Sequence, residues 1–93
     1  MRKMSTSLPR GWKRYKTQED AQVTLWLENV RTGSILSVVP WGSRDPNDVA
    51  IRASSVFGRV EIPGHKQLVM DKSPKEIYEI ASRAHKRRFG KVL

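Results

Sequence analysis

The alternation of hydrophobic and polar positions is clearest in residues 23–28. A period of two predicts a β-strand with one buried face, and Trp26 falls on the face opposite to the neighbouring leucines. A second apolar stretch covers residues 34–39. The residues between the two stretches, 29–33, have the composition of a turn and include Gly33, which can adopt a positive φ. The pattern therefore predicts an antiparallel β-hairpin.

Residues 45–57 fit two patterns. Asp45 and Pro46 are typical of a helix start, as N-cap and first helical residue, and Gly58 is typical of a helix end. Apolar residues between them recur at helical spacing, but some of them also alternate as they would in a strand. We expect a short helix here and keep the strand as the alternative. The alternating residues are Val49, Ile51 and Ala53.

Two further apolar stretches, residues 59–62 and 67–70, flank residues 63–66. This intervening segment begins with a Pro-Gly pair, which is typical of a turn. We therefore predict a second hairpin.

The clearest helix begins near residue 73. Ser73 and Glu76 have the spacing of a capping box, and Pro74 stands at the first helical position. An apolar stripe at helical spacing follows, and Gly90 is a natural stop. The stripe consists of Ile77, Ile80, Ala81 and Ala84.

These elements predict an α+β fold, in which a small antiparallel sheet of two hairpins packs against the C-terminal α-helix. A second short helix near 45–57 would add to it. Residues 1–7 are expected to form a flexible basic arm. Residues 8–93 are expected to form a single compact domain, since a chain of 93 residues has the usual size of one domain.

Charge gives the first indication of a partner. Lysine and arginine outnumber aspartate and glutamate by 18 to 9, so the formal net charge is +9. A charge this large attracts polyanions, of which nucleic acid is the commonest. The N-terminal basic group comprises Arg2, Lys3, Arg10, Lys13, Arg14 and Lys16. The C-terminal basic group comprises Arg83, Lys86, Arg87, Arg88 and Lys91.

The two basic groups allow two interpretations. If both ends of the chain meet on one side of the sheet, they form a single patch that can follow a phosphate backbone. The alternative is an ordinary solvated surface, in which the cations of the last helical turn complement the helix dipole.

Aromatic side chains beside cations can stack on bases. Trp26 is the main candidate, because its strand neighbours point the other way, although it could equally be a packing residue. Trp12 and Trp41 are expected to pack within the fold.

One segment resembles the WW domain pattern, between residues 8 and 40. The matching residues are Leu8, Pro9, Gly11, Trp12, Trp26, Asn29, Thr32 and Pro40. The resemblance implies a twisted three-stranded start and packing of Trp12 on Pro40. The second tryptophan of the family, which binds proline-rich ligands, falls on Ser37 here, so the ligand site of that family is incomplete.

Signals for catalysis are weak. His65 and His85 are expected on the surface, and neither has carboxylates at a spacing typical of metal ligands. No serine lies in a nucleophile-elbow pattern, and the glycines are scattered singly. We expect no enzyme activity, no cofactor and no metal site, and assign no catalytic residues.

The chain has no cysteine, which excludes disulfides and thiolate chemistry. Its longest apolar runs cover only a few residues, so we predict no transmembrane helix and no membrane partner. The first residues lack the apolar core of a secretion signal. A cytoplasmic location is therefore expected.

The sequence thus predicts a small basic protein that contacts the phosphate backbone of DNA or RNA without strong sequence specificity. The candidate contact residues are Arg10, Lys13, Arg14, Lys16, Trp26, Arg83, Lys86, Arg87, Arg88 and Lys91. One alternative is a non-enzymatic adaptor or inhibitor, for example of viral or mobile-element origin, that binds an acidic protein partner. Another is an accessory protein of a ribonucleoprotein.

Overall fold

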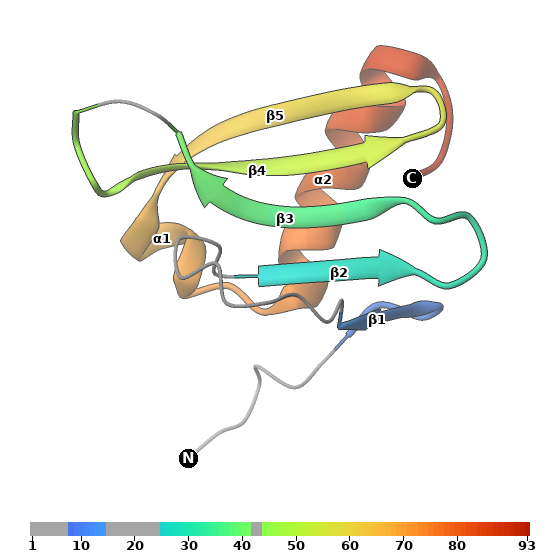
Figure 1. The fold of residues 1–93 in the computed structure, drawn as a ribbon, viewed down its shortest axis with the longest axis horizontal. Helices are drawn as coiled ribbons and strands as arrows, with labels where there is room; N and C mark the ends of the chain where they lie inside the picture. The colour runs from blue at the N-terminus through green and yellow to red at the C-terminus, as the bar shows by residue number, and fades with distance from the viewer. Residues whose placement is uncertain (1–7, 15–24, 42–43) are drawn as a thin grey trace.

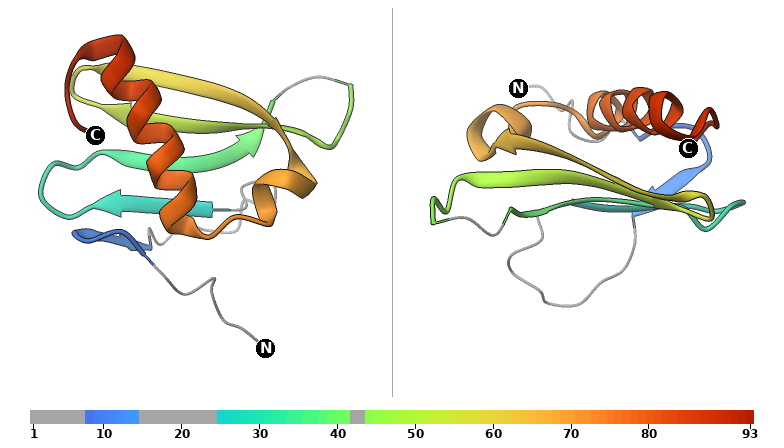
Figure 2. Two further views of the ribbon diagram at one scale, coloured as in Figure 1. Left: turned by 180° about the vertical axis from the view of Figure 1, so that it is seen from behind. Right: turned by 90° about the horizontal axis from the view of Figure 1, so that it is seen from above.

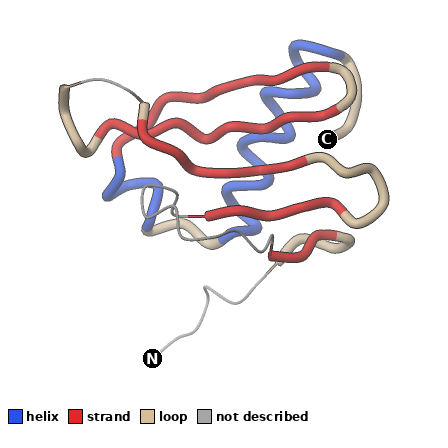
Figure 3. Tube along the Cα trace, viewed as in Figure 1, coloured by secondary structure: helices blue, strands red, loops and turns tan. Residues whose placement is uncertain are grey.

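The computed structural model describes residues 8–14, 25–41 and 44–93. Five strands form one antiparallel sheet in chain order, and the longer helix crosses one of its faces (Figures 1 and 2). The strands are β1 (Trp12–Arg14), β2 (Leu25–Asn29), β3 (Ile35–Pro40), β4 (Asp48–Ser55) and β5 (Gly58–His65). The helices are α1 (Lys66–Met70) and α2 (Pro74–Phe89), drawn in blue in Figure 3. The predicted α+β fold, with an antiparallel sheet against a C-terminal helix, is confirmed.

The first predicted hairpin is present as β2 and β3, with Trp26 paired to Ser37. The turn forms because the Asn29 side-chain oxygen accepts the backbone N–H groups of Arg31 and Thr32, at 2.8 and 3.0 Å. Gly33 closes the turn with a φ of 78°, which few residues other than glycine adopt without strain. The start of the predicted strand, residues 23–24, lies outside the described residues.

The helix expected over residues 45–57 is wrong, and the strand alternative is right. The Asp45 carboxylate accepts the Asn47 N–H at 2.9 Å, and the Asp45 carbonyl accepts the Asp48 N–H at 3.0 Å. Asp45 thus closes a turn that leads into β4 instead of capping a helix. Val56 and Phe57, which the helix would have buried, form the exposed tip of the β4–β5 hairpin.

The second predicted hairpin, over residues 59–70, is also wrong. Pro63 and Gly64 lie within β5, paired with Ala50 and Val49 of β4. Proline fits there because β5 is the outer strand of the sheet, where a missing N–H costs no ladder hydrogen bond. The following apolar residues form the short helix α1, which the sequence pattern did not predict.

Helix α2 begins and ends as predicted. The Ser73 side chain accepts the Glu76 N–H at 3.2 Å, and the Glu76 carboxylate accepts the Ser73 N–H at 2.8 Å, which completes the capping box. Gly90 ends the helix in the left-handed conformation. Within the predicted stripe, Ile77 and Ala81 are buried in the core.

The core lies between α2 and the sheet. A row of paired residues crosses four strands on this face: Leu27, Leu36, Ala53 and Val60. All four are buried, and they belong to one cluster with Ile77 and Ala81 of α2. Because burying apolar surface contributes roughly 25 cal/mol per Å², this row helps to attach the helix to the sheet.

A different row occupies the opposite face of the sheet. Trp26 pairs with Ser37, Ser37 with Arg52, and Arg52 with Glu61. Because side chains alternate along each strand, this row points away from α2. The two faces are therefore chemically distinct: one is apolar and covered by the helix, and the other carries charged and aromatic residues.

Candidate nucleic-acid interface

The C-terminal half of α2 carries an unbroken positive charge. After Glu79 the sequence contains five lysines or arginines and no acidic residue. All members of the C-terminal basic group are exposed. Three of them, Lys86, Arg87 and Arg88, occupy the last helical turn, where the helix dipole favours cations.

Among the described residues, no acidic side chain forms an ion pair with these cations. The ion pairs among the described residues join Arg52 to Glu61 at 2.7 Å and Arg59 to Glu61 at 3.9 Å, and none involves the C-terminal basic group. Within this group, Arg88 lies over the Phe89 ring and Lys91 over the Phe57 ring. Like charges three or four residues apart on a helix repel each other, so an anionic ligand here would relieve that repulsion.

The basic end of α2 is held firmly on the sheet. His85 is 0% exposed and hydrogen-bonds Ser55 at the end of β4, so the expectation that it lies on the surface is wrong. The Phe57 and Phe89 rings pack near its imidazole. This anchoring fixes the helix backbone that carries the neighbouring cations, which lowers the entropy lost on binding.

Arg59 adds a cation that the sequence did not single out. It lies on β5, and with Arg88 of α2 it lines a hollow of about 560 Å³. Its side chain is 59% exposed, and its only ion-pair partner among the described residues is the distant Glu61 oxygen. The sequence could not reveal that Arg59 and Arg88 line one hollow, because only the packing of α2 on the sheet brings both residues to it.

The N-terminal basic group lies elsewhere. Arg10, Lys13 and Arg14 are exposed at β1, the outer strand on the other side of the sheet, while Lys16 lies outside the described residues. Four strand spacings of ~4.8 Å separate β1 from β5, about 19 Å in all. Helix α2 starts near β1 and ends near β5 (Figure 2). The described parts of the two basic groups therefore do not form one patch.

The tryptophans have three different environments. Trp12 is buried in the core, as expected, and its ring meets Tyr78 edge-on with 5.4 Å between centroids. It lies near the Asn29 end of β2, whereas Pro40 lies beyond the other end. Trp26 is half-buried on the face away from α2, so it does not adjoin the C-terminal basic group. Trp41, expected to pack within the fold, is 41% exposed.

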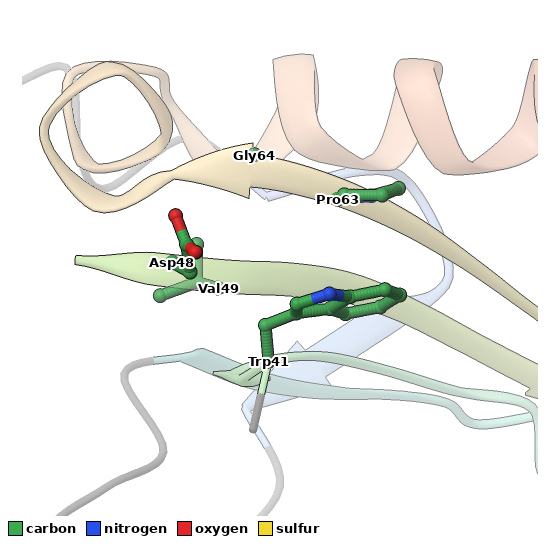
Figure 4. Close-up of a pocket in the computed structure, with 5 residues that line it drawn as sticks. All are labelled: Trp41, Asp48, Val49, Pro63 and Gly64. Carbon is green, nitrogen blue, oxygen red and sulfur yellow. The ribbon is translucent and has the colours of Figure 1, made fainter. Parts of the chain in front are cut away.

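Trp41 follows β3 and extends beside β4 towards Pro63 of β5 (Figure 4). It lines a hollow of about 280 Å³ with Asp48, Val49, Pro63 and Gly64. It also lines the larger hollow that contains Arg59 and Arg88. An exposed indole and two arginines thus line the same hollow, a combination that suits stacking on a base next to a phosphate.

The described residues contain no cluster of three or more potential metal ligands. His65, exposed as expected, caps α1 by accepting the Gln67 N–H at its Nδ1 atom. Among the residues that the structure describes, no helix is both long enough and apolar enough to cross a bilayer.

No family model, curated protein or solved structure matches this chain. Its function is therefore inferred from the chemistry of its surface.

Proposed function

We propose that this protein binds nucleic acid through the phosphate backbone, with the C-terminal half of α2 as the main contact element. The observation that carries the proposal is the C-terminal basic group: five exposed cations in the last part of the chain, with no ion pair among the described residues. Phosphates would neutralise these charges and release condensed counterions, which favours binding entropically.

The proposed contact is with the backbone rather than with base pairs. Lysine and arginine on an exposed helix face reach phosphates without a fixed geometry, whereas base-pair readout needs side chains placed in a groove. Binding without strong sequence specificity follows. The described members of the N-terminal basic group, Arg10, Lys13 and Arg14, lie at the opposite edge of the sheet and would be a second, separate contact. A cytoplasmic location is part of the proposal.

The test is a titration of labelled single-stranded and duplex oligonucleotides with two variants of equal charge. Lys86→Ala/Arg87→Ala/Arg88→Ala removes three cations from the proposed interface. Lys66→Ala/Lys72→Ala/Lys75→Ala removes three exposed cations, from α1, from the connection between the two helices and from the start of α2. Both variants lower the net charge from +9 to +6, so they separate a local contact from general attraction.

We expect the first variant to bind both oligonucleotides much more weakly and the second to resemble the wild type. Equal losses in the two variants would mean that only net charge matters. If the wild type shows no salt-sensitive binding to nucleic acid, yet holds an acidic protein at the same salt concentration, the proposal is wrong.

A further inference from the structure

The hollow lined by Trp41, Arg59 and Arg88 includes an aromatic ring, which binding to a phosphate backbone does not require. Its lining comes from the residue after β3, from β5 and from α2, and also includes Val60, Glu61 and Ala84. The volume of about 560 Å³ lies within the range of small-molecule sites, roughly 300–1,000 Å³. An exposed aromatic ring and two cations therefore line one hollow at the outer edge of the sheet, with Trp41 and Arg59 on the face away from α2 and Arg88 on α2 itself.

We infer that this hollow is a subsite for an unpaired nucleobase and its adjoining phosphate, so that the protein prefers single-stranded nucleic acid to duplex. The inference rests on the proposed function and specifies its ligand. Trp41 would stack on the base, and Arg59 and Arg88 would contact the phosphate. In a duplex the base faces are already stacked on one another, so a duplex can use only the cations.

Trp41 lines two hollows, and the charge distribution supports placing the base in the larger one. The smaller hollow on the indole is lined by Asp48 and by no lysine or arginine, so it offers no cation for a phosphate. In the larger hollow, the one carboxylate is that of Glu61, and its Oε2 atom is bound by Arg52 at 2.7 Å. Glu61 already pairs closely with Arg52, and its contact with Arg59 is longer, at 3.9 Å. Arg59 is therefore largely available to bind a phosphate.

The solvent exposure of the lining residues also supports placing the base in the larger hollow. Trp41 keeps 41% of its surface exposed, while Trp12, which packs in the core, keeps 6%. Arg59 and Arg88, which also line the hollow, are exposed. A stacked base would therefore cover aromatic surface that the fold leaves in water.

The test compares Trp41→Ala, Trp41→Phe and Arg59→Ala with the wild type on a short oligothymidylate, an oligouridylate and a duplex of matched length. Trp41→Ala should weaken binding to both single strands by about tenfold and leave duplex binding unchanged, since one base–aromatic stack is lost. Trp41→Phe should recover part of the loss, because it keeps an aromatic ring. Arg59→Ala should weaken single-strand binding more than duplex binding. Thermal unfolding of each variant checks the fold.

The outcomes separate the two proposals. If Trp41→Ala and Arg59→Ala bind the single strands as the wild type does, while all bind duplex in a salt-sensitive way, the subsite is refuted and the proposed function stands. If the wild type binds neither single strand nor duplex, both are refuted.

Discussion

The Nε2 atom of His85 lies 2.7 Å from the Ser55 hydroxyl, and its Nδ1 atom lies 2.8 Å from the Lys91 carbonyl oxygen. Because a carbonyl oxygen can only accept, Nδ1 carries a proton, and in the neutral ring Nε2 accepts from the Ser55 hydroxyl. One buried side chain of α2 thus holds both the end of β4 and the segment after the helix. This contact fixes the orientation of the basic end of α2 on the sheet.

Replacing His85 should therefore destabilise the fold. His85→Ala leaves a cavity and removes one hydrogen-bond partner each from the Ser55 hydroxyl and the Lys91 carbonyl. We expect a loss of about 2–4 kcal/mol in the free energy of unfolding. Urea denaturation measures it. His65→Ala is the matched control: His65 is exposed and only caps α1, so its loss should cost about 1 kcal/mol or less. Similar stability of the two variants would contradict the anchoring role.

Gly58 makes a second close contact with the basic end of α2. A Cβ atom at this position would lie 2.6 Å from Cζ of Phe89, and the φ of 141° disfavours any other residue. Gly58→Ala should cost about 2 kcal/mol or more, because it adds a steric clash to backbone strain. Gly33 also has a positive φ, but a Cβ atom there would meet open space. Gly33→Ala should therefore lower the free energy of unfolding by only about 1 kcal/mol.

A double-mutant cycle isolates the clash from the strain. Phe89→Leu shortens the side chain that the new Cβ would meet. Combined with Gly58→Ala, it should recover part of the loss, giving a coupling of about 1 kcal/mol. Strict additivity in thermal unfolding would show that strain alone explains the effect.

The capping box at the start of α2 supports the other end of the helix. Ser73→Ala removes the acceptor for the Glu76 N–H and should lower the free energy of unfolding by about 1 kcal/mol. Ser73→Asp keeps an acceptor and should retain wild-type stability. Chemical denaturation of both variants checks this, and an unstable Ser73→Asp protein would show that the cap is not the reason.

Local signals explain which elements the sequence could predict. The capping box, the apolar stripe and Gly90 act within α2, so its boundaries were predictable. The β2–β3 hairpin was predictable from alternation and its turn. Residues 45–57 were not, because Asp45 and Pro46 suit a helix start and a β-turn equally well. Pairing of β4 with both β3 and β5 decided the outcome.

The candidate site shows the same division. The C-terminal basic group was predictable because it is contiguous in sequence. The hollow at the outer edge was not, since Trp41, Arg59 and Arg88 are far apart in the chain and meet only through tertiary packing. Whether the two basic groups would meet was left open by the sequence, because it depends on the path of α2, which carries its basic end away from β1.

The salt dependence of nucleic-acid affinity tests the central claim most directly. Each phosphate contact with a single strand contributes about −0.7 to the slope of log K against log salt concentration. Lys86→Ala/Arg87→Ala/Arg88→Ala loses up to three contacts, so its slope should be shallower than that of the wild type by up to about 2. Lys66→Ala/Lys72→Ala/Lys75→Ala should keep the wild-type slope. A slope near zero for the wild type, or parallel slopes for the wild type and the first variant, would contradict the assignment of α2 as the phosphate-binding element.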